Sequence, residues 1–163
     1  MDTHAGRLLF AALGAIFIFY VVVTDMSFKY DQTNIPNINT CVQEFVDKSV
    51  VTGKINKSNM QDMYDALYRT GYIYDVQITH KSLYEYPKDD GDYTSHFDAY
   101  SKEYILENVD TDGNYKMKDG DNLTVSIKTK SPTLSERAIG SITGRGFAPI
   151  MYTYSKDVGN TLR

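Results

Sequence analysis

The feature that most constrains this chain is an uncharged apolar run close to its start, LLFAALGAIFIFYVVV, which covers residues 8–23. Arg7 precedes the run and Asp25 follows it, so sixteen consecutive residues carry no charge. Extended through Thr24, the run forms a helix of about 25 Å, which is the lower limit for crossing the hydrocarbon core of a bilayer. We expect a membrane and assembly helix with the apolar side chains Leu8, Leu9, Phe10, Leu13, Ile16, Phe17, Ile18, Phe19, Val21, Val22 and Val23.

Two other interpretations of this run exist. A buried helix of a soluble protein usually keeps polar residues at its rim, and none lies between Leu8 and Phe19. A cleaved secretory signal also has an apolar region behind a basic start, but residues 24–27 lack a small-x-small cleavage pattern. We therefore expect an uncleaved anchor.

The charges beside the run predict its orientation. Arg7 is the only Lys or Arg before it, which places the short amino terminus in the cytoplasm by the positive-inside rule. We expect a single-pass membrane protein with a lipid bilayer as its first partner. Its predicted parts are a cytoplasmic stub at residues 1–7, a transmembrane helix at 8–24, a linker at 25–39 and an extracytoplasmic domain at 40–163.

Composition excludes several classes of protein. A chain of 163 residues suits one domain, and 42% hydrophobic residues are too many for a disordered chain. Its net charge of −4 supplies no positive field to attract nucleic acid, whose binding needs Lys and Arg against phosphates. The single cysteine, Cys41, excludes an intramolecular disulfide and a multi-cysteine zinc site. We expect no nucleic-acid partner.

Hydrophobic periodicity predicts two helices at the start of the domain. The first is capped by Thr40, ends at Gly53 and carries an apolar stripe of Val42, Phe45, Val46 and Val50. The second begins at the capping pattern of residues 58–61 and ends at Gly71. Its apolar face is predicted to contain Met60, Met63, Tyr64, Leu67 and Tyr68.

Beyond Gly71 the period changes to two, which predicts strands. We expect strands at residues 72–80, 123–128 and 150–154, a surface loop at 85–92, a helix at 93–108, a short helix opened by the capping box of Thr133 and Glu136, and a flexible segment at 140–146. This order favours an α+β domain of two to four helices with an antiparallel sheet of about three strands.

One loop has the spacing of a calcium site. Asn108, Asp110, Asp112 and Asp119 fall at positions 1, 3, 5 and 12, and Gly113 lies at the bend in position 6. Position 12 is Asp where a longer bidentate Glu is usual, and the residues that follow predict a strand. The alternative is a tight turn, because Asp-Gly followed by alternating residues is a strong hairpin signal. Apart from calcium at this loop, we expect no cofactor.

No catalytic constellation is evident in the sequence. The three histidines are scattered without a second His or Cys at ligand spacing, and Cys41 lies between packing residues without a catalytic signature. We expect no enzyme activity and no small-molecule substrate.

Several segments resemble a known family. Residues 45–55, 60–67 and 70–78 follow the order helix, Thr-Gly turn, helix, glycine, strand, and residues 120–125 and 149–154 are also similar. Together with the apolar helix, this order resembles TadE-like minor pilins and pseudopilins of tight-adherence systems, which are related to type IV pili and to Gram-positive conjugation or secretion clusters. The resemblance implies a pilin-like fold, a structural or assembly role, and partners that are other pilin-like subunits or membrane assembly proteins.

The same resemblance implies a processing site. Families of this kind place a glycine before the hydrophobic stretch, and Gly6-Arg7 lies at that position here. A Glu often follows five residues later, where this chain has Ala11, and its absence suits a minor or priming subunit. The alternative function is a single-pass anchored binding or scaffold protein that never polymerises.

Overall fold

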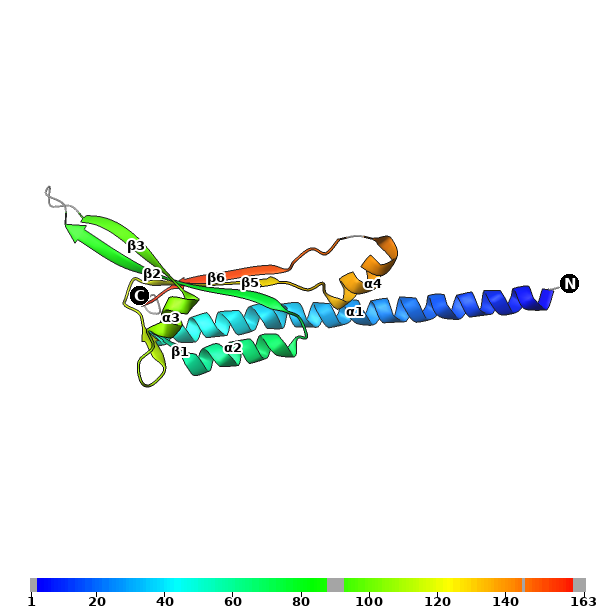
Figure 1. Cartoon of the computed structure of the whole chain (residues 1–163), viewed down its shortest axis with the longest axis horizontal. Coiled ribbons are helices and arrows are strands. Elements are labelled where there is room, and N and C mark those ends of the chain that lie inside the picture. The colour runs from blue at the N-terminus through cyan, green and yellow to red at the C-terminus, as the bar shows by residue number, and fades with distance from the viewer. Residues whose placement is uncertain (1–2, 88–92, 145, 160–163) are drawn as a thin grey trace. The chain divides into compact units, whose positions relative to one another are not determined.

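The computed structural model describes residues 3–87, 93–144 and 146–159, and it is of the α+β class (Figure 1). It divides into two compact units, unit 1 with residues 1–36 and 132–148, and unit 2 with residues 37–131 and 149–163. The elements in chain order are α1 (Thr3–Thr52), β1 (Lys54–Asn56), α2 (Lys57–Arg69), β2 (Tyr74–Pro87), β3 (Tyr93–Ser101), α3 (Lys102–Glu107), β4 (Asn114–Lys116), β5 (Asn122–Thr129), α4 (Leu134–Thr143) and β6 (Met151–Asp157).

Unit 2 is built on an antiparallel sheet of four strands in the order β3-β2-β5-β6. The long strand β2 pairs with β3 through residues 79–87 and with β5 through residues 74–81. Leu83 lies opposite Phe97, and Ile78 lies opposite Val125. A second sheet contains only β1 and β4, which pair antiparallel with Ile55 opposite Tyr115. The α+β class and the antiparallel pairing are thus as predicted, with one strand more in the main sheet and a small second sheet.

One face of the main sheet is covered by helices. Strand β5 buries Leu123, Val125 and Ile127 and leaves the alternate side chains partly exposed, as the period of two predicts. The core of unit 2 combines these residues with the apolar stripes of α1 and α2. Its buried hydrophobic residues include Ile38, Val42, Phe45, Val46, Val50, Met60, Met63, Leu67, Ile78 and Ile105.

Polar bonds hold the last strand against α1 within unit 2. The Tyr154 hydroxyl donates to Asp47 Oδ1 at 3.2 Å, and Lys156 Nζ lies 2.8 Å from the same oxygen. One turn away, Gln43 Nε2 donates to the Tyr152 hydroxyl at 2.7 Å. Alternate residues of β6 therefore face α1, which fixes the register of this edge strand.

The predicted linker at residues 25–39 is helical in the structure, and Thr40 is an exposed interior residue of α1 and not a helix cap. Pro36 and its polar neighbours suggested a break, because an interior proline loses one backbone hydrogen bond and clashes with the preceding turn, at about 3 kcal/mol. The helix continues because both flanks are held. Asp31 is bonded to α4 in unit 1, and Ile38 is fully buried in unit 2.

The predicted helix at residues 93–108 is also wrong. Residues 93–101 form β3, and only α3 at Lys102–Glu107 is helical. Phe97, Tyr100 and Tyr104 have helical spacing by coincidence, whereas pairing with nine residues of β2 satisfies the backbone as a strand. Of the predicted loop at 85–92, residues 85–87 belong to β2 and residues 88–92 lie outside the described part.

Most of the predicted helix ends are confirmed. Gly53 has φ of +62° and ends α1 as predicted. Thr133 and Glu136 form the predicted reciprocal capping box at the start of α4. The helix continues to Thr143 and ends at Gly144, which has the left-handed conformation. The first residues of the segment predicted as flexible, 140–143, are therefore helical. For α2 the cap is Asn56, whose Oδ1 accepts from Ser58 N at 2.7 Å, so the helix begins earlier than the predicted Ser58.

Candidate functional site

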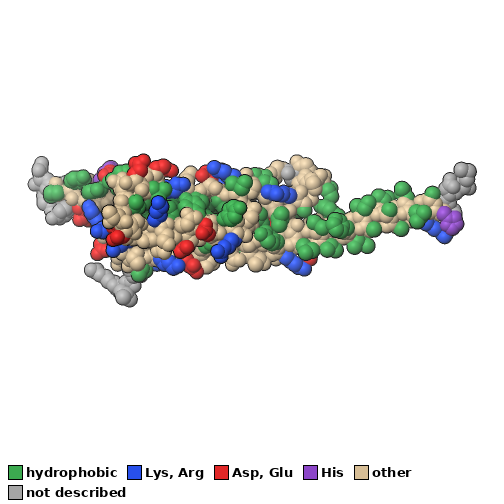
Figure 2. Space-filling model, turned by 60° about the horizontal axis from the view of Figure 1, so that its bottom comes forward, with side chains coloured by type: hydrophobic (Ala, Val, Ile, Leu, Met, Phe, Trp, Pro, Cys, Tyr) green, Lys and Arg blue, Asp and Glu red, His purple; other side chains and the backbone are tan. Residues whose placement is uncertain are grey.

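The apolar run of α1 is a bare helix in unit 1. Its large side chains are exposed, from Phe10 at 77% to Val23 at 38%. Figure 2 shows the same stretch as a row of green hydrophobic side chains near the amino terminus. In the part of the chain that the structure describes, one helix is long and apolar enough to cross a membrane, and none of its most apolar 18-residue window is buried. A membrane-span-like helix is therefore present near the amino terminus, as predicted.

Exposure on this scale has a physical consequence. Burial of apolar surface stabilises by about 25 cal/mol per Å², and contiguous exposed patches on soluble monomers rarely exceed a few hundred Å². The largest side chains are mostly exposed, such as Phe17 at 67% and Phe19 at 71%. Exposure of this kind is typical of a helix that lies in lipid or against other apolar helices.

Helix α4 is docked against the last turn of this run and the part of α1 that follows it, within unit 1. Asp31 is 5% exposed, and its Oδ2 accepts a hydrogen bond from Ser135 N at 3.0 Å. This carboxylate thus satisfies an unpaired amide in the first turn of α4 and complements the helix dipole. Within the apolar run itself, the Tyr20 hydroxyl donates to Ala138 O at 3.2 Å.

Asp31→Ala is expected to release the start of α4. Loss of a buried charged acceptor costs about 1–3 kcal/mol, so amide exchange in the first turn of α4 should accelerate by roughly tenfold or more. Hydrogen exchange of the full chain in detergent measures this effect. Asp25→Ala is the control, because Asp25 pairs with Lys29 on the exposed face of the same helix. Unchanged exchange at Ser135 would contradict the expected role of Asp31.

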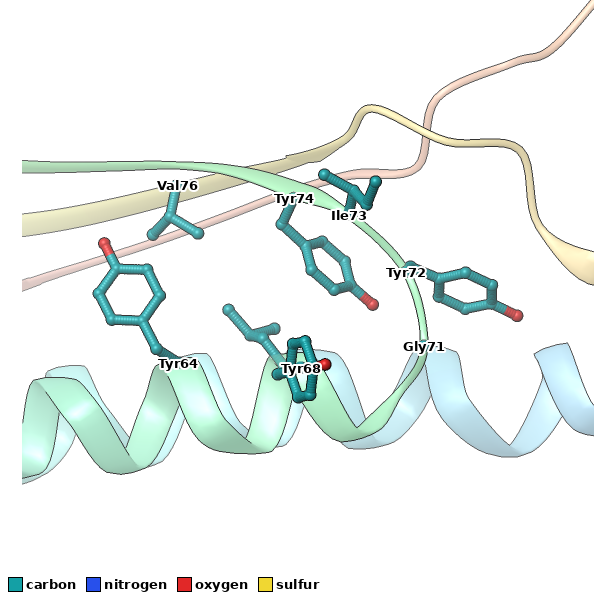
Figure 3. Close-up of a pocket in the computed structure, with 8 residues that line it drawn as sticks. Tyr64, Tyr68, Gly71, Tyr72, Ile73, Tyr74 and Val76 are labelled. Carbon is teal, nitrogen blue, oxygen red and sulfur yellow. The ribbon is translucent and has the colours of Figure 1, made fainter.

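A second feature, in unit 2, is a pocket of about 550 Å³ between α2 and the start of β2. It is open on one side and mainly apolar, and Figure 3 shows tyrosines from both elements around it. The Tyr64 hydroxyl is buried without a hydrogen-bond partner among the described residues. The lining residues are Tyr64, Leu67, Tyr68, Gly71, Tyr72, Ile73, Tyr74 and Val76.

Sequence reasoning placed Tyr68 in the core, and the structure places it on the pocket rim at 84% exposed. Eight steps of 100° turn Tyr68 about 80° from Met60, to the margin of the apolar stripe of α2. Leu67, closer to the middle of the stripe, is buried at 2% exposed. The pocket was not predicted because periodicity shows which side of a helix is apolar. It does not show whether the residues at the edge of that side are covered by another element.

The predicted calcium loop is held together by its own hydrogen bonds. Asp110 Oδ1 accepts from Asp112 N at 3.0 Å and from Asn114 N at 2.9 Å, and these bonds lower the pKa of Asp110. Gly113 has φ of +75°, as the sharp bend requires, and Asn108 ends α3. Among the described residues no group of three or more His, Cys, Asp or Glu side chains is arranged to hold a metal ion. The turn leads into β4, which pairs with the distant β1 and not with its neighbour in sequence.

We expect calcium to leave this loop unchanged. Asp110 Oδ1 already accepts from two backbone amides, and no three acidic, His or Cys side chains are arranged among the described residues to supply the several ligands that calcium needs. A calorimetric titration of the full chain should give no heat, and its thermal midpoint should not move with added calcium. A rise in the midpoint that Asp119→Ala abolishes would restore the calcium site.

The structure also brings together a buried polar network that the sequence analysis missed. His80 Nε2 lies 2.8 Å from Asp121 Oδ2, and His80 Nδ1 lies 2.9 Å from the Tyr115 hydroxyl. Burial raises the pKa of Tyr115 to about 12. His80 is 2% and Asp121 1% exposed, so the network is part of the core and not open to a substrate. The sequence contained one indication of this network, because His80 falls on the predicted apolar face of its strand, where a polar side chain needs buried partners.

The remaining predicted residues lie apart from these features. Gly6 and Arg7 lie in the first turns of α1, with Arg7 exposed. The Cys41 thiol is half-buried against the core of unit 2 and donates to Ile38 O at 3.1 Å. Burial, together with the Glu44 carboxylate, raises its pKa to about 11, so it is a protonated packing group at neutral pH.

Comparisons with known proteins add no relative. No protein family, no curated protein and no solved structure matches the chain. The functional conclusion therefore depends on the apolar helix, on the fold and on the sequence segments described above.

Proposed function

We propose that this protein is a non-catalytic, pilin-like assembly subunit of a type IV-related pilus, secretion or conjugation apparatus. The observation that carries this proposal is the division of α1. Residues 8–23 are apolar and exposed, whereas Ile38, Val42 and Val46 of the same helix are fully buried in a domain with an antiparallel sheet. A long helix with one bare apolar part and one part inside an α+β domain suits a subunit that is anchored first and assembled later.

The same apolar surface of α1 serves in the membrane and in the assembled filament. In the membrane the side chains of residues 8–23 contact lipid, and in a filament they contact the equivalent helices of neighbouring subunits. Neither environment exposes them to water, so the transfer between the two keeps the apolar area buried. Helix packing then depends on close contacts between side chains, for which Ala11, Ala12 and Gly14 provide close-approach positions.

The proposed topology has residues 1–7 in the cytoplasm and unit 2 outside it. Arg7 and Asp25 flank the run with the charge order that favours this orientation. The expected partners are a bilayer and other pilin-like or membrane assembly proteins. Processing at Gly6-Arg7 belongs to the same proposal, because removal of the stub would free the helix for a filament.

Fractionation of native cells tests the proposal. The protein should be recovered in sheared filaments together with other subunits, and mass spectrometry should find an amino terminus that begins at Arg7. An intact amino terminus, together with permanent retention in the membrane fraction while filaments form, would contradict it.

A second candidate function is an anchored extracytoplasmic binding or scaffold protein, and the tyrosine-lined pocket favours it. Tyr68 and Ile73 are 84% and 63% exposed on its rim, and amphipathic aromatic residues are enriched in contact surfaces. Tyr68→Ala combined with Ile73→Asp separates the two functions. Loss of partners from membrane-bound protein, with no change in filament recovery, would support the scaffold.

A further inference from the structure

We propose that α4 and the chain just after it lie in the headgroup region of the bilayer and form a lipid-binding collar beside the outer end of the apolar run. The collar is defined as Ala138, Ile139, Ile142 and Phe147. This inference rests on the proposed membrane anchoring of residues 8–24 and concerns unit 1 alone.

The direction of α4 places the collar at the level of the carboxyl-terminal end of the apolar run. Its early residue Ser135 is bonded to Asp31, whereas the later Ala138 is bonded to Tyr20. Later residues of α4 thus meet earlier residues of α1, so α4 runs toward the apolar run. Tyr20 lies four residues, or about 6 Å, inside the end of the run at Thr24. An interfacial helix buries its apolar face about 5–10 Å into the headgroup boundary, which matches this level.

The collar is apolar; Ala138 and Ile139 are partly buried, whereas Ile142 and Phe147 are exposed. Ala138, Ile139 and Ile142 have the i, i+1, i+4 spacing of one helix face, and Ile142 at the far end is 66% exposed. Phe147 adds an aromatic side chain at 38% exposed, and its segment is tied to α4 by the bond from Ala148 N to Glu136 Oε1 at 3.2 Å. The exposed Arg137 lies off this face, where its long side chain can reach the headgroups.

Lipid is favoured over a protein partner because the collar continues the apolar surface of α1. On α1 itself, Met26 and Phe28 are 65% and 42% exposed just past the run, beside the exposed ion pair of Asp25 and Lys29. Apolar and charged side chains alternate there, as in the interfacial zone of a bilayer. The run of about 25 Å is shorter than a hydrocarbon core of about 30 Å, and an apolar collar beside its end reduces the cost of that mismatch.

Single tryptophans test this inference, because the native chain contains none. The variants are Ile142→Trp, Phe147→Trp, Phe17→Trp in the middle of the run, and Ile73→Trp on the exposed surface of unit 2. Each full chain is reconstituted in phosphatidylcholine vesicles that carry bromine near the headgroup or deep in the acyl chains. Bromine quenches tryptophan only at close range.

We expect shallow bromine to quench Ile142→Trp and Phe147→Trp about twofold more strongly than deep bromine, with the reverse for Phe17→Trp and no quenching of Ile73→Trp. If Phe17→Trp is quenched while both collar variants respond like Ile73→Trp, the collar is wrong and the anchor stands. Blue-shifted collar emission without bromine quenching would place a protein there and also overturn the inference. If Phe17→Trp is not quenched, the anchoring proposal fails as well.

Discussion

Phe17→Asp is expected to remove the protein from the membrane fraction. Phe17 lies in the middle of the apolar run and is 67% exposed, so under the proposed anchoring its replacement meets lipid directly. A charged side chain at the centre of a membrane helix costs roughly 2.5–3.5 kcal/mol, and phenylalanine contributes about −0.3 kcal/mol, so insertion should become about a hundredfold less favourable. Because the run is at the lower length limit for a membrane span, its insertion free energy is too small to offset this cost. Recovery in carbonate-washed membranes measures the effect.

Two matched variants define what this result means. Phe17→Leu keeps the apolar character and should stay fully in the membrane. Val51→Asp introduces the same charge on the same helix at a side chain that is 60% exposed in unit 2, and it should also stay. If Phe17→Asp remains wholly with washed membranes, residues 8–23 do not serve as the anchor.

The parts of the fold that sequence could predict are those encoded by local pattern. The stripe of Val42, Phe45, Val46 and Val50 is buried as its spacing predicts, and so is the alternating set in β5. Gly53 and the Thr133 capping box ended and began helices at the predicted places. Each of these signals depends on residues within one or two turns of each other, which is the range that periodicity and capping describe.

The parts that sequence did not predict depend on distant partners. Pro36 looks like a break when only its neighbours are considered, whereas contacts from residues about 100 positions away hold the helix on one side of it. Residues 93–101 have helical spacing, yet β2 supplies their hydrogen bonds. The same limit applies to the sites. The apolar run was evident from sequence, whereas the pocket and the collar required the folded positions of α2 and α4.

Asp121→Ala is expected to be the most destabilising substitution in unit 2. Asp121 is 1% exposed, and its two carboxylate oxygens accept four hydrogen bonds. The donors are His80 Nε2 at 2.8 Å, Ser82 Oγ at 3.0 Å, Leu83 N at 3.1 Å and Lys118 N at 2.7 Å. Truncation leaves all four donors without this acceptor, two of them on the buried side chains of His80 and Ser82, and we expect the free energy of unfolding to fall by about 3–5 kcal/mol. Urea denaturation of the full chain in detergent, followed by tyrosine circular dichroism, measures the loss.

The pH dependence of the same variant tests the cause. Burial alone would raise the pKa of Asp121, but the hydrogen bonds from Lys118 N, His80, Leu83 N and Ser82 outweigh it and lower the pKa. A carboxylate whose pKa is lower in the folded state stabilises the fold above its unfolded pKa of about 3.9, and this contribution is lost as the pH falls through the folded value. The gap between wild type and Asp121→Ala should therefore be full at pH 7 and shrink below about pH 4. Asp119→Ala, an exposed carboxylate two residues away, should unfold like wild type at both pH values. A gap that stays constant in acid would show that Asp121 acts through packing alone and not through its charge.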